Sequence, residues 1–482
     1  MNACRIRSTN SAPAKVVRSA KSLAALSIGV AALLVGTISP SLAQTVTDFY
    51  SFTGTESSAL PQHVTPAQGR DGKLYGTTSG QGGTNYGTIF TVSTSRRFRQ
   101  LHTFDSTDGS QPGGGIVLAS DGNFYGTAFS GGSAGFGLLF RISSSGVYTV
   151  LHEFAGGADG AAPAAPPIAG SDGTLYGTTY GNAAIGSTIY KYTRSTASLT
   201  TLYQFDQAHG SGVIPPLVQG ADGNLYGAAY QGGANNCGTI FKVTTSGTLL
   251  WYYSFLCTPS GANPVGPLIQ GSDGSFYGTT SAGGNRGVGT VFKLDQGGNV
   301  SILYNFQSFF GGGADGSTPF AGLVQATDGN LYGSTTAAGS QNLGTLFQIT
   351  TAGAYKLLYS FNGKAGSGPE AAPVQHTNGM LYGTALQGGK FGFGTVYRLD
   401  MGLAPFVALV RYGGKVGSTA QILGQGLTGT TSVTFNGVAS NNVHVFSDTL
   451  LTAVVPFGAT TGPVVVTTPT GALTSNKNFA VQ

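Results

Sequence analysis

The chain has 482 residues, of which 9% are charged, and it contains 79 glycines, 28 phenylalanines and 22 tyrosines. This composition fits an all-β extracellular protein better than a cytosolic α/β enzyme, and it argues against long helices. Five of the 23 lysines and arginines lie in residues 1–43, which hold no acid, so residues 44–482 carry 18 basic and 18 acidic residues. That balance excludes the basic footprint of a protein that binds nucleic acid or an anionic membrane.

The first segment, residues 1–43, has the pattern of a secretory signal peptide. Five basic residues precede or begin an apolar stretch from Leu23 to Val35, and Ser41-Leu42-Ala43 forms a small-x-small cleavage site. A membrane anchor is the alternative, but the apolar run is shorter than the ~20 residues that span a bilayer. We expect an exported protein with no membrane span after signal removal, located in the periplasm, at the cell surface or outside the cell.

Residues 44–400 repeat one motif seven times, with Asp172-Gly173-Thr174-Leu175-Tyr176-Gly177 as an example. The Asp-Gly pair predicts a turn, since glycine accepts positive φ and aspartate bonds nearby amides; in the last repeat Asn378 replaces the aspartate. The repeated tyrosines are spaced by 50, 51, 50, 51, 55 and 50 residues, a period typical of blade arrays. They are Tyr75, Tyr125, Tyr176, Tyr226, Tyr277, Tyr332 and Tyr382.

Each repeat predicts four strands. An apolar run precedes the turn, Leu-Tyr-Gly-Thr-Thr follows it, a Gly-Thr-Ile-Phe segment is third and Leu-Tyr-x-Phe is fourth. Because the second strand has small residues, we expect it to approach neighbouring strands closely, near a crowded axis. The fourth motif follows only six of the third strands, and the seventh copy is Phe49-Tyr50-Ser51-Phe52, ahead of all the repeats.

An N-terminal strand that completes the last blade would close a ring and remove two free sheet edges. The pattern therefore predicts a seven-bladed β-propeller over residues 44–400, closed by an N-terminal strand. A β-helix or an open stacked array is the alternative.

Two cysteines, Cys237 and Cys257, remain after the signal peptide, which contains Cys4. Both lie ten residues from Gly247, near the centre of the predicted hairpin of the fourth repeat, so they face each other across the ladder. In an oxidising compartment this arrangement predicts a disulfide. Two free buried thiols are the alternative, and metal binding is poorly supported by two cysteines without a nearby histidine.

After Asp400 the repeat stops, and residues 401–482 predict a second domain. Short segments that alternate apolar and polar residues fit an immunoglobulin-like β-sandwich without a core disulfide. The predicted strands lie within 416–427, 432–437, 453–459 and 462–467.

The C-terminal segments resemble the IPT/TIG domain, through Val416 to Leu427, Ser432 to Gly437 and the run from Val455 to Val466. In bacterial surface proteins this resemblance implies a rigid spacer or an adhesive module. The repeats, through their Asp-Gly-x-Leu-Tyr-Gly-Thr and Gly-Thr-Ile-Phe pairs, resemble the GloVer tandem repeat of exported bacterial proteins. That resemblance implies no settled activity and no catalytic residue. A looser similarity to streptogramin lyase-like propellers concerns the architecture only.

No catalytic residue, metal ligand or cofactor is predicted. The repeated acids occur once per blade, which indicates turns, and no serine elbow, histidine pair at ligand spacing or phosphate loop is present. A second set of Asp-Gly pairs, at Asp108, Asp159 and Asp315, is only a weak indication of calcium. Three of the six histidines in residues 44–482 have structural explanations: His102 and His152 stand for an aromatic residue in the fourth strand, and His376 precedes a turn. The others are His63, His209 and His444.

Binding candidates come from positions that the repeat does not require. The 55-residue step contains an insertion with Phe309 and Phe310, and the variable glycine-rich loops carry Arg286 and Phe391. Plain connectors are the alternative for these loops.

Three functions are compatible with this pattern. The first is an exported, non-catalytic binding or adhesion protein of the cell envelope whose propeller loops contact a carbohydrate or a protein. The second is a secreted polysaccharide lyase or hydrolase with its site at the propeller mouth, where unrepeated polar residues would converge. The third is a purely structural envelope component.

Overall fold

The computed structural model describes residues 45–54, 60–80, 85–181, 186–307 and 315–482. These residues form β-strands and no helix, so the all-β prediction is confirmed. Accordingly, nothing helical within them has the length and apolar character required to cross a bilayer.

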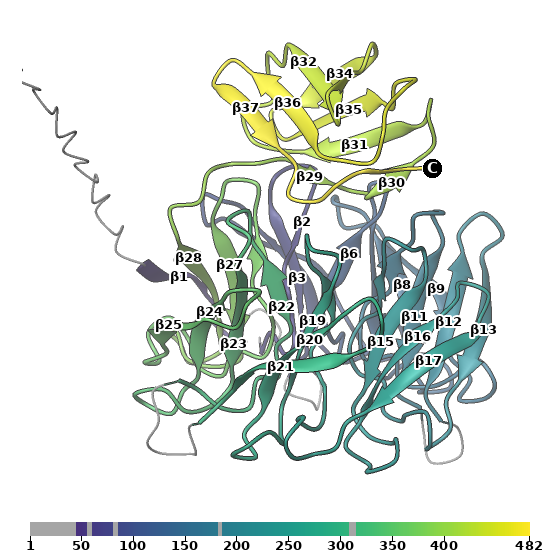
Figure 1. Ribbon diagram of the computed structural model, residues 1–482, viewed down its shortest axis with the longest axis vertical. Helices are drawn as coiled ribbons and strands as arrows, with labels where there is room; N and C mark the ends of the chain where they lie inside the picture. Colours follow the sequence, from purple (N-terminus) through teal and green to yellow (C-terminus); the bar gives the residue numbers. More distant parts are fainter. Residues whose placement is uncertain (1–44, 55–59, 81–84, 182–185, 308–314) are drawn as a thin grey trace, which may run out of the picture. The chain divides into compact units, whose positions relative to one another are not determined.

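The described residues between Thr45 and Asp400 form seven antiparallel sheets of four strands each (Figure 1). We number these sheets 1 to 7 by the order of their first strands. The first strands are β2 (Ala67–Gln68), β6 (Ile116–Leu118), β10 (Ile168–Ala169), β14 (Val218–Gln219), β18 (Ile269–Gln270), β22 (Leu323–Gln325) and β26 (Val374–Gln375). The second strands are β3 (Leu74–Thr78), β7 (Phe124–Ala128), β11 (Leu175–Thr179), β15 (Leu225–Ala229), β19 (Phe276–Thr280), β23 (Leu331–Thr335) and β27 (Leu381–Ala385).

The third and fourth strands form a hairpin in sheets 1 to 6, whereas sheet 7 takes its fourth strand from the start of the chain. The third strands are β4 (Thr88–Val92), β8 (Leu138–Ile142), β12 (Thr188–Thr193), β16 (Thr239–Val243), β20 (Thr290–Leu294), β24 (Thr345–Ile349) and β28 (Thr395–Asp400). The fourth strands are β5 (Phe98–Thr103), β9 (Tyr148–Glu153), β13 (Ser198–Gln204), β17 (Leu249–Ser254), β21 (Val300–Asn305), β25 (Tyr355–Ser360) and, in sheet 7, β1 (Thr45–Ser51).

The repeated aspartate joins the turn to the second strand by two hydrogen bonds. In sheet 5, Oδ1 of Asp273 accepts from the backbone N–H of Ser275 (3.1 Å) and Oδ2 accepts from the hydroxyl of Tyr277 (2.7 Å). The tyrosine donates in the same way, at 2.6–2.9 Å, in sheets 1 to 6. In sheet 7, the side-chain amide of Asn378 donates to the hydroxyl of Tyr382 (3.1 Å). The aspartates therefore have a structural role in turns, as their repetition indicates.

The glycine after the repeated tyrosine leaves room for an aromatic ring of the third strand. Gly76 pairs in register with Phe90, and a Cβ on Gly76 would lie 2.8 Å from that ring. The equivalent pairs are Gly126 with Phe140, Gly177 with Tyr190, Gly227 with Phe241, Gly278 with Phe292, Gly333 with Phe347 and Gly383 with Tyr397. The close approach of a neighbouring strand, which the small residues predict, is therefore confirmed. The neighbour is the third strand of the same sheet, whereas residues of the first strands line the cavity.

Strand β1 pairs antiparallel with β28, from Thr45 opposite Asp400 to Ser51 opposite Thr395. Figure 1 shows β1 beside β28, although more than 340 residues separate them. The N-terminal segment thus completes the last sheet, as the offset of the fourth-strand motif predicts. Just beyond β1, the N–H of Phe52 donates to the carbonyl of Gly394 (3.1 Å).

Apolar clusters join the sheets in a cyclic order. Six clusters each contain residues of two consecutive sheets, from sheets 1 and 2 to sheets 6 and 7. A further cluster joins sheet 7 to sheet 1, with Phe49, Phe52 and Val396 packed among Leu74 and Phe90. In the described part of the chain, every sheet therefore has a neighbouring sheet on both sides.

The junction of sheets 7 and 1 has the same hydrogen bonds as an interior junction. Between sheets 6 and 7, Oε1 of Gln375 accepts from the N–H of Thr327 (3.0 Å), and Nε2 donates to its hydroxyl oxygen (2.9 Å). At the junction, Oε1 of Gln68 accepts from the N–H of Thr377 (2.9 Å), and Nε2 donates to its hydroxyl oxygen (2.8 Å). The repeat thus bonds across the ends of the chain as it does within it.

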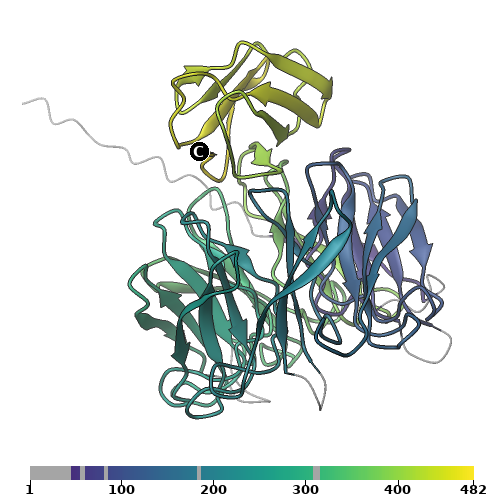
Figure 2. The same ribbon diagram turned by 90° about the vertical axis from the view of Figure 1, so that its right-hand side faces the viewer.

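Residues beyond 405 form two four-stranded sheets that share one apolar core (Figure 2). The first contains β29 (Ala408–Leu409), β31 (Thr419–Leu423), β35 (Leu450–Val454) and β34 (Val443–Ser447), and the second β33 (Val438–Ala439), β32 (Ser432–Phe435), β36 (Val464–Thr468) and β37 (Gly471–Thr474). A parallel pair joins β30 (Gly413–Gly414) to β38 (Ala480–Val481). The strand expected at 453–459 lies at 450–454, because Pro456 has no N–H to continue the ladder.

Side chains of the C-terminal part hydrogen-bond to the sheets. Nη2 of Arg70 donates to Oε1 of Gln421 (2.5 Å), and Nε2 of Gln421 donates to the carbonyl of Ser120 (2.6 Å). The ammonium of Lys477 donates to the carbonyl of Gln270 (2.5 Å). These contacts reach the ends of first strands, on the side of the Asp-Gly turns.

Replacement of Phe52 by alanine tests the closure. Phe52 is fully buried against Phe90 of sheet 1, as Phe104 is buried against Phe140 of sheet 2. If the cycle is closed, Phe52→Ala and Phe104→Ala each lower the free energy of unfolding by about 3–5 kcal/mol, as expected for a fully buried phenylalanine. Guanidinium unfolding measures both. A loss below about 1 kcal/mol for Phe52→Ala alone would mean that β1 is not a structural strand.

His376 gives the junction a pH dependence. Its buried ring donates from Nε2 to the carbonyl of Gly72 (2.9 Å) and accepts at Nδ1 from the N–H of Asn378 (3.1 Å), which requires the neutral form. Burial lowers the pKa of His376 below its ordinary value. The unfolded chain therefore binds this proton first, and stability is lost as pH falls below about 6.5.

We expect urea unfolding at pH 7.5 and pH 5.5 to show this loss in the native protein and a smaller loss in His376→Gln. The exposed His444 provides the matched control, His444→Gln, which should retain the native pH dependence. An equal acid loss in His376→Gln and the native protein would contradict the assignment.

Candidate functional site

A cavity of about 680 Å³ lies among the first strands of the seven sheets. Its volume falls within the range of small-molecule and peptide side-chain pockets. Residues that precede the first strands, such as Ile214 and Phe320, and residues that follow the second strands, such as Phe129 and Tyr180, also line it. The mouth therefore lies at the ends of the strands opposite the Asp-Gly turns.

One position of the repeat contributes to the mouth from every sheet. It lies twelve residues before the repeated tyrosine, and in all seven sheets the residue at this position lines the cavity. Whereas the surrounding motif repeats, this position differs in each unit. From sheet 1 to sheet 7 it is His63, Gly113, Ala164, Ile214, Val265, Phe320 and Glu370.

We call these seven residues the ring of the cavity mouth. Its two ionisable members meet at the junction of sheets 7 and 1. Nδ1 of His63 lies 3.6 Å from Oε2 of Glu370, and the side chains are 40% and 17% exposed. The ring of Phe320 lies 6.2 Å from that of His63, between centroids. Closure of the cycle thus brings together an imidazole and a carboxyl group that are 307 residues apart in the sequence.

The carboxyl group of Glu370 is incompletely satisfied. Its Oε2 is buried and has no hydrogen-bond partner within the described residues. Burial raises the pKa of Glu370, and the charge and the backbone amide of His63 oppose this only in part. A carboxylate oxygen in this state can accept a hydrogen bond from a ligand or form an ion pair with a positively charged ligand.

Aromatic side chains flank the small members of the ring. Phe129 and Tyr180, which follow the second strands of sheets 2 and 3, are 36% and 39% exposed. Gly113 and Ala164 occupy the ring position in the same two sheets. The mouth is therefore asymmetric, with open aromatic faces over sheets 2 and 3 and a polar pair at the junction of sheets 7 and 1.

The loop candidates do not belong to this cavity. Arg286 is exposed between β19 and β20, with Nε 3.5 Å from Oε1 of Gln307. Phe391 is 46% exposed between β27 and β28, and its ring lies 5.0 Å from the ammonium of Lys390. Neither lines the cavity. Phe309 and Phe310 lie outside the described residues.

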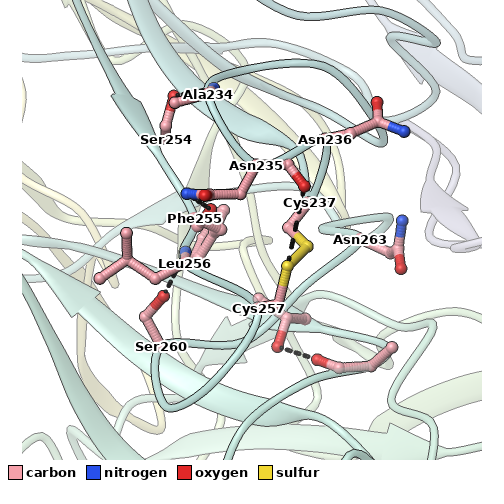
Figure 3. The surroundings of a disulfide bond; sticks show 12 residues. Ala234, Asn235, Asn236, Cys237, Ser254, Phe255, Leu256, Cys257, Ser260 and Asn263 are labelled. Carbon is pink, nitrogen blue, oxygen red and sulfur yellow. Dashed lines mark hydrogen bonds between the residues drawn. A yellow bond between two sulfur atoms is a disulfide. The ribbon is translucent and has the colours of Figure 1, made fainter.

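Cys237 and Cys257 form a disulfide, as predicted, with their Cα atoms 5.4 Å apart (Figure 3). The bond joins the segment before β16 to the segment after β17, at the open end of that hairpin. Nδ2 of Asn235 also donates to the carbonyl of Phe255 across the same end (3.3 Å). The disulfide closes a hairpin loop on the outer part of sheet 4 and does not line the cavity.

The aspartates of the second set of Asp-Gly pairs contact side chains of the fourth strands. Asp108 lies 2.9 Å from Nε2 of His102, and the ring of His102 stacks on that of Tyr148 with 3.9 Å between centroids. Asp159 lies 3.0 Å from Nε2 of His152. No group of three or more histidine, cysteine, aspartate and glutamate side chains in the described ranges is arranged to hold a metal ion.

Neither Glu370 nor Phe320 is predicted from the sequence as a site residue, and no role is predicted for His63. Each follows a segment that looks like an ordinary apolar connection, and a single repeat shows nothing unusual. The signal becomes visible when the repeats are aligned on their tyrosines: position minus twelve is the one that lines the mouth yet changes in size and charge.

A model of the Gloeobacter/Verrucomicrobia repeat matches three overlapping ranges, residues 35–186, 149–326 and 308–479. No curated protein matches the chain.

Three solved structures share a distant likeness. TolB from Acinetobacter baumannii is 16% identical, with 59% of this chain and 62% of that chain covered and a TM-score of 0.37. Hydrazine synthase from Kuenenia stuttgartiensis is 13% identical over 70% and 96%, with a TM-score of 0.49. The Dos1 propeller is 11% identical over 68% and 75%, with a TM-score of 0.45. The chain thus spans less than two thirds of the TolB structure, and these likenesses concern the fold alone.

The disulfide generates a stability prediction. It closes a loop of about 20 residues, so its removal should lower the free energy of unfolding by about 2–4 kcal/mol. The variant is Cys237→Ser with Cys257→Ser, unfolded in guanidinium under non-reducing conditions. Addition of a reductant should destabilise the native protein and leave this variant unchanged. Equal stability of the native protein and the variant without reductant would contradict the assignment.

Proposed function

The chain belongs to the Gloeobacter/Verrucomicrobia repeat family, and from that premise we propose that it is an exported, non-catalytic binding or adhesion scaffold whose propeller mouth and loops contact a glycan or a protein. The proposed domains are a signal peptide (1–43), a seven-bladed β-propeller (44–400) and an IPT/TIG domain (401–482).

Several observations support this organisation. Seven four-stranded sheets, cyclic apolar clusters and the pairing of β1 with β28 are what a closed seven-bladed propeller requires. Two sheets packed on one core fit an immunoglobulin-like IPT/TIG domain, which would act as a spacer or adhesive module. The disulfide fits export to an oxidising compartment, in the periplasm or beyond the cell.

The binding function depends on one observation, the ring of seven positions at the cavity mouth. A scaffold that is built from repeats has no structural reason to place glycine, isoleucine, phenylalanine, histidine and glutamate at equivalent positions. Exposed, unrepeated side chains around a cavity are what ligand selection requires. The aromatic faces of Phe129 and Tyr180 add contact area beside that ring.

A second candidate, a secreted polysaccharide lyase or hydrolase, is favoured by the His63–Glu370 pair. An imidazole beside a carboxyl group whose pKa is raised by burial can support general acid–base catalysis. Turnover in a screen of polysaccharides that Glu370→Gln abolishes, without loss of binding, would decide for this candidate.

The binding proposal is tested with the purified mature protein on glycan and peptide arrays. Ala164→Trp should fill the mouth, and we expect it to weaken binding at least tenfold, which is about 1.4 kcal/mol. Leu250→Ala, on the exposed face of β17, is the matched control and should bind as the native protein does.

The loops are tested with the double variant Arg286→Ala, Phe391→Ala. If this variant loses binding while Ala164→Trp retains it, the loops and not the mouth form the contact surface. Absence of any glycan or peptide ligand, together with absence of turnover, would contradict the binding function and leave a structural envelope component.

A further inference from the structure

We infer that the mouth takes an apolar segment of a protein partner that carries one amine, a lysine side chain or a free amino terminus, with Glu370 as its counter-charge. This inference rests on the proposed binding function and names the class of ligand for the same site.

The cavity wall favours an apolar ligand. Most of it is built of aliphatic side chains and proline rings, which have no hydrogen-bonding group to offer a sugar. The uncharged polar side chains are a minority of the lining, and they include Gln62, Thr65, Ser79, Gln111 and Tyr180. A glycan in such a pocket would leave many hydroxyl groups unpaired, and each buried unpaired group is costly. An apolar segment instead gains from contact with the same wall. The prolines that line the cavity are Pro66, Pro166, Pro167, Pro215, Pro216, Pro267 and Pro373.

The charge of the site selects a cation. Among the described residues that line the cavity, Glu370 is the one carboxylate, and neither lysine nor arginine occurs. An anionic ligand would therefore meet no fixed positive charge and one negative charge. An ammonium group would meet a counter-charge in a partly desolvated site, where ion pairs are stronger than at an open surface.

One carboxylate oxygen of Glu370 also has room to accept a hydrogen bond. Its Oε2 makes no hydrogen bond in the described structure, and Nδ1 of His63 is 3.6 Å away, beyond the usual range of N–H···O bonds. An incoming ammonium group can supply the missing donor, because it carries three N–H bonds on a narrow stem.

Among the described residues that line the cavity, Glu370 supplies the one carboxylate, so a ligand needs only one amine to pair with it. The equivalent residue of the preceding sheet is Phe320, whose face can stabilise a cation within about 6 Å. The equivalents in sheets 4 and 5 are Ile214 and Val265, which extend the apolar wall away from the charge. A ligand thus meets one carboxylate at the mouth and a pocket that is mostly apolar.

The first test uses small probes of equal length: n-octylamine, n-octanol and octanoate, titrated calorimetrically into the full mature protein at pH 8. We expect octylamine to bind at least tenfold more tightly than octanol, and octanoate to bind more weakly than either. In Glu370→Gln, octylamine should lose its advantage while octanol binds as in the native protein. Equal affinities for amine and alcohol in the native protein would overturn the inference.

The variants separate charge recognition from folding. If Glu370→Gln weakens octanol and octylamine alike, the residue supports the shape of the pocket and the inference fails. Phe320→Leu, which keeps an apolar side chain, should reduce octylamine binding more than octanol binding. An equal reduction for both probes would remove Phe320 from cation recognition.

The second test addresses the partner. Two acetylated apolar peptides are compared, one with a single lysine and one with norleucine at the same place. The lysine peptide should bind at least tenfold more tightly, and Ala164→Trp should abolish both interactions. Binding of glycans but of neither peptide, blocked by Ala164→Trp, would overturn this inference and leave the proposed mouth function intact. Binding that Ala164→Trp does not affect would instead overturn the proposed mouth function itself.

Discussion

The pairing of β1 with β28 is the constraint on which the rest of the structure depends. Without it, sheet 7 would have three strands, and Phe49 and Phe52 would not pack on Leu74 and Phe90 of sheet 1. With it, the hydroxyl of Thr384 in sheet 7 donates to the carbonyl of Val64, which precedes sheet 1 (2.6 Å). The equivalent hydroxyl of Thr279 in sheet 5 donates to the carbonyl of Ala321, which precedes sheet 6 (2.6 Å). The cavity exists because the cycle has no open junction in its described residues, and the His63–Glu370 pair exists because that junction joins two chain segments 307 residues apart.

The repeat and the mouth obey different requirements. The aspartate–tyrosine bond, the glycine under an aromatic ring and the buried phenylalanine after the fourth strand recur because each sheet must form the same turns and pack on the next. The position twelve residues before the tyrosine has no such duty, since it faces the cavity. It is therefore free to differ, and in the proposed function that freedom determines what is bound.

Much of the fold follows from the sequence, and most of the site does not. Periodicity locates the turns, the strands and the disulfide from Cys237 to Cys257, and the displaced copy at Phe49 to Phe52 locates the closing strand. The small residues of the second strand predict a close approach, but periodicity does not reveal that the covering group is the ring of Phe90 over Gly76. Glu370 is missed because its significance arises from its neighbour His63, and only a closed cycle makes them neighbours.

The exposed candidates Arg286 and Phe391 lie outside the cavity, and their role in binding stays a prediction. Variable loops attract attention because they lie outside the motif, but variation in a loop needs no function to explain it. Variation at a position enclosed by repeating structure is more informative, and it becomes visible only when the residues that line the cavity are known.

Hydrogen exchange of the backbone amides in the β1–β28 ladder measures directly whether the N-terminal strand closes the cycle. If the cycle is closed, the amides of β1 that hydrogen-bond to β28 exchange as slowly as those of β5 that bond to β4. The N–H of Phe52, bonded to the carbonyl of Gly394, should match that of Phe104, bonded to the carbonyl of Gly87. Exchange of the β1 amides at the rate of an unpaired terminal segment, with the β4–β5 ladder protected, would contradict closure and with it the mouth, its ring of seven positions and the junction of His63 with Glu370.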